Sequence, residues 1–92
     1  MAIKPNQNPS HPGEILGGIY LADRGINQSE LAKMLGCTHA KVNQIINGKR
    51  GITPEFAIQL ERVLGTSAEM WVNLQATWDL HIARKRLKKG AA

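Results

Sequence analysis

The stretch INQSELAKMLGCTHAKVNQIINGKRGI, residues 26–52, decides the fold. It predicts two short helices joined by a tight turn. Asn27 can cap the first helix through its side-chain oxygen, and Glu30 follows three residues later, as in a capping box. Gly36 stands where a helix ends in a left-handed residue, a conformation that costs little only for Gly or Asn. Thr38 is then expected to cap the second helix.

The second helix of this stretch is expected to have an apolar face and a polar face. Val42, Ile45 and Ile46 recur at helical spacing and predict the buried stripe. The polar face offers amide groups that can bond base edges, and it carries no carboxylate. Its residues are Ala40, Asn43, Gln44 and Asn47, with His39 and Lys41 on the flanks. A helix pair joined by a glycine-containing turn fits the helix-turn-helix unit, which places its second helix in the DNA major groove.

The charge distribution points to a polyanionic partner. Residues 31–54 contain Lys33, Lys41, Lys49 and Arg50 and no acidic residue. A helix face that is merely solvated usually mixes Glu with Lys. The formal net charge is +5 and the sequence pI is about 9.8. These values fit a nucleic-acid binder, although basic proteins also bind membranes or acidic proteins. The helix-turn-helix geometry alone is a weak signal, because any small helical bundle contains helix pairs with glycine turns.

Length and composition predict one small domain. The chain has 92 residues and is 42% hydrophobic, and it contains no run of about 20 apolar residues that could span a bilayer. The single cysteine, Cys37, excludes an internal disulfide framework, and the N-terminus lacks the apolar core of a signal peptide. We therefore expect a cytoplasmic protein without membrane contact. The expected organisation is a flexible arm over 1–10, the domain over 11–87 and a basic tail over 88–92.

The rest of the chain is also predicted to be helical. Residues 11–25 are expected to form a helix whose core contacts come from Ile15, Leu16, Ile19 and Leu21. Thr53 and Pro54 start another helix, which ends at Gly65, and Ser67 caps a last helix that runs from 68 to about 86. No strand pattern appears, so the sequence predicts an all-α domain of five helices with the helix-turn-helix at its centre.

The last helix has two apolar stripes on opposite sides. The first stripe contains Trp71, Leu74, Trp78 and Ile82, and the second contains Val72, Ala76, Leu80, Ala83 and Leu87. A surface helix of a monomer needs only one apolar face. The second stripe predicts a homodimer interface made by Val72, Ala76, Leu80 and Ala83. The alternative is that this helix crosses the middle of the bundle.

No constellation of residues predicts catalysis, a metal or a cofactor. His11 and Glu14 have a spacing that can hold a metal, but no further Cys or His completes a tetrahedral site. Asp79 and His81 lie two apart on a helix and point in different directions. The GKRG run over 48–51 does not have the spacing of a Walker phosphate-binding motif. We expect no enzyme.

The segment over 11–80 resembles the HigA family of antitoxins, also called VapI-like, within the Xre/lambda-repressor-like class. The matching motifs are HPGEIL over 11–16, QSELAKMLG over 28–36 and INGKRGITPEFAIQLERVLGTSAEMWVNLQATWDL over 46–80. The most diagnostic part lies within the last of these motifs, because generic Xre repressors share the helix-turn-helix but not this tail. It consists of Gly65-Thr66-Ser67 followed by Met70-Trp71, Asn73-Leu74-Gln75 and Asp79-Leu80.

This resemblance implies a homodimeric lambda-repressor-like DNA-binding domain on a palindromic operator in its own promoter. It also implies a partner toxin of the HigB type, a RelE-like mRNA-cleaving nuclease that the antitoxin neutralises while it represses the operon. By this resemblance, Gln28 is the residue that contacts a DNA phosphate, and the basic loop of the family corresponds to Lys49 and Arg50. The base-reading positions fall on Thr38, His39, Ala40, Lys41, Asn43 and Gln44.

One position departs from the resemblance, and two other functions stay open. Many relatives carry Arg where Gln44 stands; Arg reads guanine, whereas Gln prefers adenine, so the operator sequence does not transfer. The first alternative function is a stand-alone Xre-type regulator without a toxin. The second is a partner-sequestering interaction module with weak DNA binding.

Overall fold

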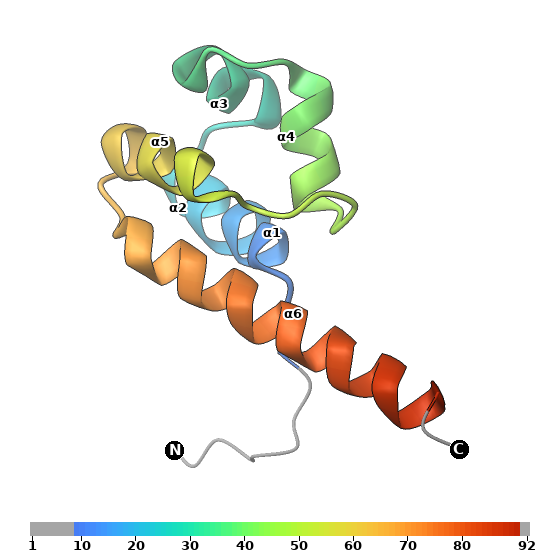
Figure 1. The fold of residues 1–92 in the computed structure, drawn as a ribbon. Coiled ribbons are helices and arrows are strands. Elements are labelled where there is room, and N and C mark those ends of the chain that lie inside the picture. Colours follow the sequence, from blue (N-terminus) through green and yellow to red (C-terminus); the bar gives the residue numbers. More distant parts are fainter. Residues whose placement is uncertain (1–8, 91–92) are drawn as a thin grey trace.

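The computed structural model describes the backbone of residues 9–90 and the side chains of residues 9–88. This part of the chain is helical and contains no strand, so the all-α prediction is confirmed. Figure 1 shows the shorter helices gathered into a body that sits along one long helix, α6. The elements are α1 (Pro12–Ile15), η1 (Leu16–Leu21), α2 (Ala22–Arg24), α3 (Gln28–Leu35), α4 (His39–Ile46), α5 (Pro54–Leu64) and α6 (Ala68–Gly90).

The first three elements form one continuous helical stretch, so the five expected helices are present. Its middle, η1, is a π-helix, whose hydrogen bonds span one residue more than those of an α-helix. Ile19 lies within this wider turn. It is 58% exposed, so its expected place in the core was wrong. Gly17 allows the close approach to α4, because an added Cβ would lie 2.9 Å from Cγ2 of Ile46.

The predicted helix starts are confirmed by side-chain caps. Asn27 Oδ1 accepts from the Glu30 N–H at 2.8 Å, and Glu30 Oε1 accepts from the Asn27 N–H at 2.9 Å. Thr38 Oγ1 accepts from the Lys41 N–H at 3.1 Å. The turn between α3 and α4 uses Gly36 with φ 71°, a left-handed conformation that suits a residue without a side chain.

The core lies between the body and the first half of α6. Trp71 of α6 is fully buried, and its Nε1 donates to Thr66 Oγ1 at 2.7 Å. The first apolar stripe of α6 thus faces the body, as predicted. The largest fully buried side chains are Trp71, Phe56, Leu16, Leu31, Ile45, Leu60 and Val42.

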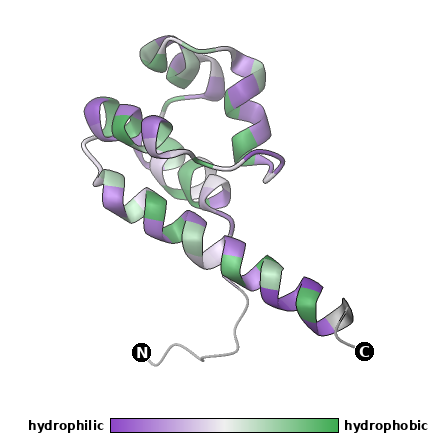
Figure 2. Ribbon diagram, in the orientation of Figure 1, coloured by the Kyte–Doolittle hydropathy of each residue, from purple (hydrophilic) through white to green (hydrophobic). Residues whose placement is uncertain are grey.

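The second apolar stripe of α6 faces outward. Val72 is 37% exposed, Leu80 53% and Leu87 70%, Ala76 is exposed and Ala83 half-buried. The alternative that α6 crosses the middle of the bundle is therefore wrong for this chain. Figure 2 shows apolar residues recurring along α6 beyond the body.

The ends of the chain differ in part from the expectation. Helix α6 continues to Gly90, so the expected end near residue 86 was wrong and the predicted tail begins inside the helix. Most of the predicted N-terminal arm, residues 1–8, lies outside the described residues, as do residues 91–92. In the described part, no helix has both the length and the apolar character needed to cross a membrane.

Candidate nucleic-acid interface

A chain of amide side chains joins the start of α3 to the end of α4. Asn43 Nδ2 donates to Gln28 Oε1 at 3.0 Å, and Asn47 Nδ2 donates to Asn43 Oδ1 at 3.1 Å. Gln28 is the first residue of α3, and Asn47 is the C-cap of α4. The three amides are therefore joined across the two helices of the helix-turn-helix and form a connected polar strip.

The loop after α4 folds back onto the same face. Gly48 adopts φ 76°, and the Lys49 N–H donates to the Gln44 carbonyl oxygen at 2.8 Å. Arg50 Nε then donates to Gln44 Oε1 at 3.1 Å. Gln44, a predicted base-reading residue, and Arg50, a predicted loop cation, are thus in direct contact. This bond uses the side-chain oxygen of Gln44 and does not involve its Nε2 hydrogens.

Helix α6 holds the far end of this loop in place. The Ile52 N–H donates to Gln75 Oε1 at 2.8 Å, and Gln75 Nε2 donates to Asp79 Oδ1 at 2.9 Å. Sequence reasoning missed Gln75, because it meets Ile52 across 23 positions of the chain and no local pattern marks such a pair. Gly51 packs close to the same amide, since an added Cβ would lie 3.1 Å from its atoms.

The predicted DNA-contacting residues do not all share one environment. Gln28, at one end of the polar strip, is half-buried, and Lys41 is half-buried with its Nζ 5.3 Å from the ring centroid of Phe56 in α5. This half-buried position fits the predicted place of Lys41 on the flank of the polar face, and the contact with the Phe56 ring is a cation–π interaction. The remaining predicted residues are exposed: Thr38, His39, Ala40, Asn43, Gln44, Lys49 and Arg50.

His11 connects the first helix to the recognition helix and to α6. It is 7% exposed, its Nδ1 accepts from the Gly13 N–H at 2.9 Å, and its ring meets Trp78 edge-on at 5.4 Å. An added Cβ at Gly48 would lie 3.7 Å from His11 Cγ, so the ring also supports the turn after α4. Within the described residues, no group of three or more His, Cys, Asp or Glu side chains could hold a metal.

Comparison with known proteins places the fold in a family. The family described as Helix-turn-helix matches residues 19–71. The structure of an addiction module antidote protein of a HigA family from Coxiella burnetii superposes with a TM-score of 0.83 at 37% identity and covers 91% of each chain. The chain belongs to the HigA family of helix-turn-helix proteins.

Two further similarities support this placement of the HigA-family chain. Virulence-associated protein I of Dichelobacter nodosus is 40% identical over 81 residues, which cover 87% of this chain and 75% of that protein. The Pseudomonas aeruginosa antitoxin HigA, solved with the higBA promoter, has a TM-score of 0.84 at 38% identity and covers 90% of each chain.

The position of His11 predicts a pH-dependent stability of this HigA-family domain. Burial lowers the pKa of His11 from its ordinary value of 6.5, although Asp79 and Glu14 oppose the shift. Below pH 6.5 the unfolded chain then binds more protons than the folded chain, so stability falls as pH drops toward the folded-state pKa. Urea unfolding between about pH 7 and pH 5 measures this loss.

The matched variant is His11→Asn, which keeps a side-chain acceptor for the Gly13 N–H but does not titrate in this range. We expect its stability to change less between pH 7 and pH 5 than that of the parent. His11→Ala should in addition lose about 1 kcal/mol at pH 7, because the cap is missing. An equal pH response in parent and His11→Asn would contradict this role of His11.

Proposed function

We propose that this protein is a DNA-binding antitoxin that acts as a homodimer in the cytoplasm. It binds a palindromic operator in its own promoter, represses its operon and neutralises a HigB-type, RelE-like mRNA-cleaving toxin. The protein is not an enzyme and uses no cofactor. The observation that carries the DNA-binding part is the outer face of α4, where exposed amides and the cations of one loop lie side by side.

The chemistry of this face suits duplex DNA. Each amide side chain has both a hydrogen-bond donor and a hydrogen-bond acceptor. These groups can form hydrogen bonds with base edges in the major groove. Lys49 and Arg50 add positive charge beside that face, where phosphate contacts fix the position of a protein on DNA. The Pseudomonas aeruginosa HigA solved with the higBA promoter has a similar fold, which supports promoter DNA as the ligand.

Gln44 and Lys49 are expected to have different roles, which mutation separates. Gln44→Ala should weaken binding to the cognate operator by about 1–3 kcal/mol and change binding to random DNA little. Lys49→Ala should weaken both similarly and reduce the salt dependence by about one charge. Fluorescence anisotropy at several salt concentrations measures both effects. If Gln44→Ala lost equal affinity for the cognate operator and for random DNA, Gln44 would not be a base-reading residue in the major groove.

The outward stripe of α6 supports the homodimer. Val72 and Leu80 are exposed apolar side chains on one face of a long helix, and burying such a face against a second copy removes apolar surface from water. A two-fold dimer would place two α4 helices about 34 Å apart and would require half-sites about 10 bp between centres.

The toxin partner is tested by co-expression with the neighbouring reading frame. The similarity to an addiction module antidote protein supports this part of the proposal. We expect the neighbouring product to arrest growth alone, and to co-purify with this protein without arresting growth when both are made. If the neighbour is harmless and does not co-purify while the operator is still bound, the protein is a stand-alone regulator.

A further inference from the structure

Arg50 and Gln44 form a side-chain pair on the outer face of α4. Arg50 Nε donates to Gln44 Oε1 at 3.1 Å, and both residues are exposed. The donor is cationic, and hydrogen bonds from a charged donor are stronger than those between neutral groups. The bond therefore influences which end of the Gln44 amide is presented to a ligand on this face.

The backbone on both sides of Arg50 is held in place. On one side, the Lys49 N–H donates to the Gln44 carbonyl oxygen at 2.8 Å. On the other side, Ile52 is 3% exposed, and its N–H donates to Gln75 Oε1 of α6 at 2.8 Å. Because the loop is anchored at both ends, Arg50 loses less conformational freedom when its side chain bonds Gln44.

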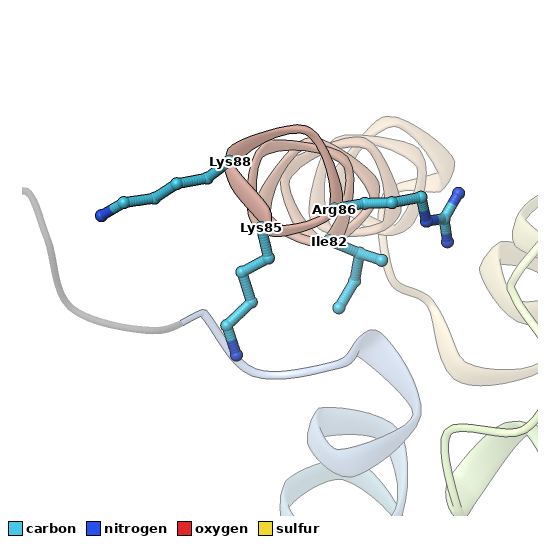
Figure 3. A pocket seen from close by; sticks show the side chains of 4 residues that line it. All are labelled: Ile82, Lys85, Arg86 and Lys88. Carbon is cyan, nitrogen blue, oxygen red and sulfur yellow. The ribbon is translucent and has the colours of Figure 1, made fainter. Parts of the chain in front are cut away.

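Positive charge alone does not distinguish Arg50 from other cations of this chain. Figure 3 shows Lys85, Arg86 and Lys88 extending from the end of α6 in different directions, and all three are exposed. Lys85 lines a groove together with Asn47, the C-cap of α4. Such cations can add attraction to any polyanion, whereas Arg50 is bonded to a predicted base-reading side chain.

The bond changes which bases suit the Gln44 amide. In the major groove adenine presents an acceptor at N7 and a donor at N6, whereas guanine presents two acceptors, N7 and O6. To pair with both groups of adenine, Gln44 must accept from N6 with the oxygen that already accepts from Arg50. That oxygen has a second lone pair, but the N6 hydrogen would then lie beside the positive guanidinium. Guanine avoids this conflict, because Gln44 Nε2 can donate to it while the bond to Arg50 stays intact.

We propose that Arg50 determines base specificity through Gln44: by holding Gln44 Oε1, it makes α4 prefer guanine over adenine at the base pair that Gln44 reads. The proposal rests on the proposed operator binding and refines it. It reverses the adenine preference that the glutamine side chain by itself implies. Arg50 is in this sense a positioning residue, because its effect on the base passes through another side chain.

The test measures base preference in addition to affinity. The full chain selects from duplexes in which the base pairs of the palindrome are randomised one at a time, and sequencing of the bound DNA gives the preference at each position. The position at which Gln44→Ala removes the preference is the one that Gln44 reads. Arg50→Met removes the donor. The matched control, Lys49→Met, removes the same charge from the neighbouring residue and keeps its backbone N–H bond to Gln44.

We expect the parent to prefer guanine over adenine at this position by about tenfold, which is within the discrimination of a good base contact. Arg50→Met should lose this preference or prefer adenine. Lys49→Met should keep the preference for guanine while it binds all the duplexes more weakly. In a Gln44→Ala background, Arg50→Met should lower affinity without changing the base preference. Arg50 and Lys49 are exposed, so both variants are expected to fold.

Four results would overturn the proposal. The first two are a Gln44→Ala protein with unchanged base preferences and a parent that does not prefer guanine at the position that Gln44 reads. The third is an equal loss of the guanine preference in Arg50→Met and Lys49→Met, which would attribute the effect to charge alone. The fourth is a change of base preference by Arg50→Met in the Gln44→Ala background, which would mean that Arg50 contacts the base itself. A parent that binds the palindrome no more tightly than random DNA would instead refute the proposed function.

Discussion

Gly13→Ala is expected to destabilise the domain by about 3 kcal/mol and to abolish operator binding under conditions where the parent is marginally stable. An added Cβ at Gly13 would overlap the carbonyl group of Ile45, which belongs to the backbone of α4. A backbone group has no alternative rotamer, so α1 and α4 must move apart. Because α4 carries the proposed reading face, the same change should disturb DNA binding. Urea unfolding followed by circular dichroism measures the stability.

Gly18→Ala is the matched control for this substitution. Gly18 lies in the same helical stretch and is exposed, and an added Cβ there would meet no atom within 4 Å. Alanine has a higher helix propensity than glycine by about 1 kcal/mol, so Gly18→Ala should be neutral or slightly stabilising. If both variants unfold at the same urea concentration as the parent, α1 does not approach α4 as closely as described.

Leu80→Asp is expected to convert the proposed dimer into a folded monomer and to weaken operator binding strongly. Leu80 is 53% exposed in the single chain, so a carboxylate is tolerated there, but it would be buried without a partner in the proposed interface. A monomer lacks the α4 helix of the second copy, so the contacts to one half-site are lost. Sedimentation at micromolar concentration and anisotropy on the palindrome measure the two effects.

Thr77→Asp is the control for Leu80→Asp. Thr77 is exposed on α6 and lies off the stripe that contains Val72 and Leu80, so the same charge enters the same helix without entering the proposed interface. Its sedimentation and operator affinity should match those of the parent. A Leu80→Asp protein that still sediments as a dimer and binds the palindrome normally would place the interface elsewhere.

The boundaries of most helices were predictable from the sequence because their signals are local. Asn27 with Glu30, and Thr38 with the Lys41 N–H, meet within three residues of the chain. Such pairs form as soon as the helix forms and do not depend on distant packing. The same holds for the outward position of Asn43 and Gln44, which follows from helical periodicity alone.

The details of the candidate site were decided by tertiary structure. Gln28 meets Asn43 across 15 positions, and Lys41 turns to Phe56 in another helix. These partners come together only when packing fixes the distance between helices, and no pattern within one helix encodes that distance. The π-turn that contains Ile19 also lies in a helical stretch that packs on α4, with close approaches at Gly13 and Gly17.

The sequence by itself thus determined where helices begin, which faces are apolar and where positive charge accumulates, because each of these depends on neighbours one to four residues away. Only the tertiary structure decided that Arg50 rests on Gln44, that Gln75 holds the loop and that Lys85 lies beside the end of α4. The physical reason is that these contacts need several helices at fixed separations, and close packing of the shared core sets those separations.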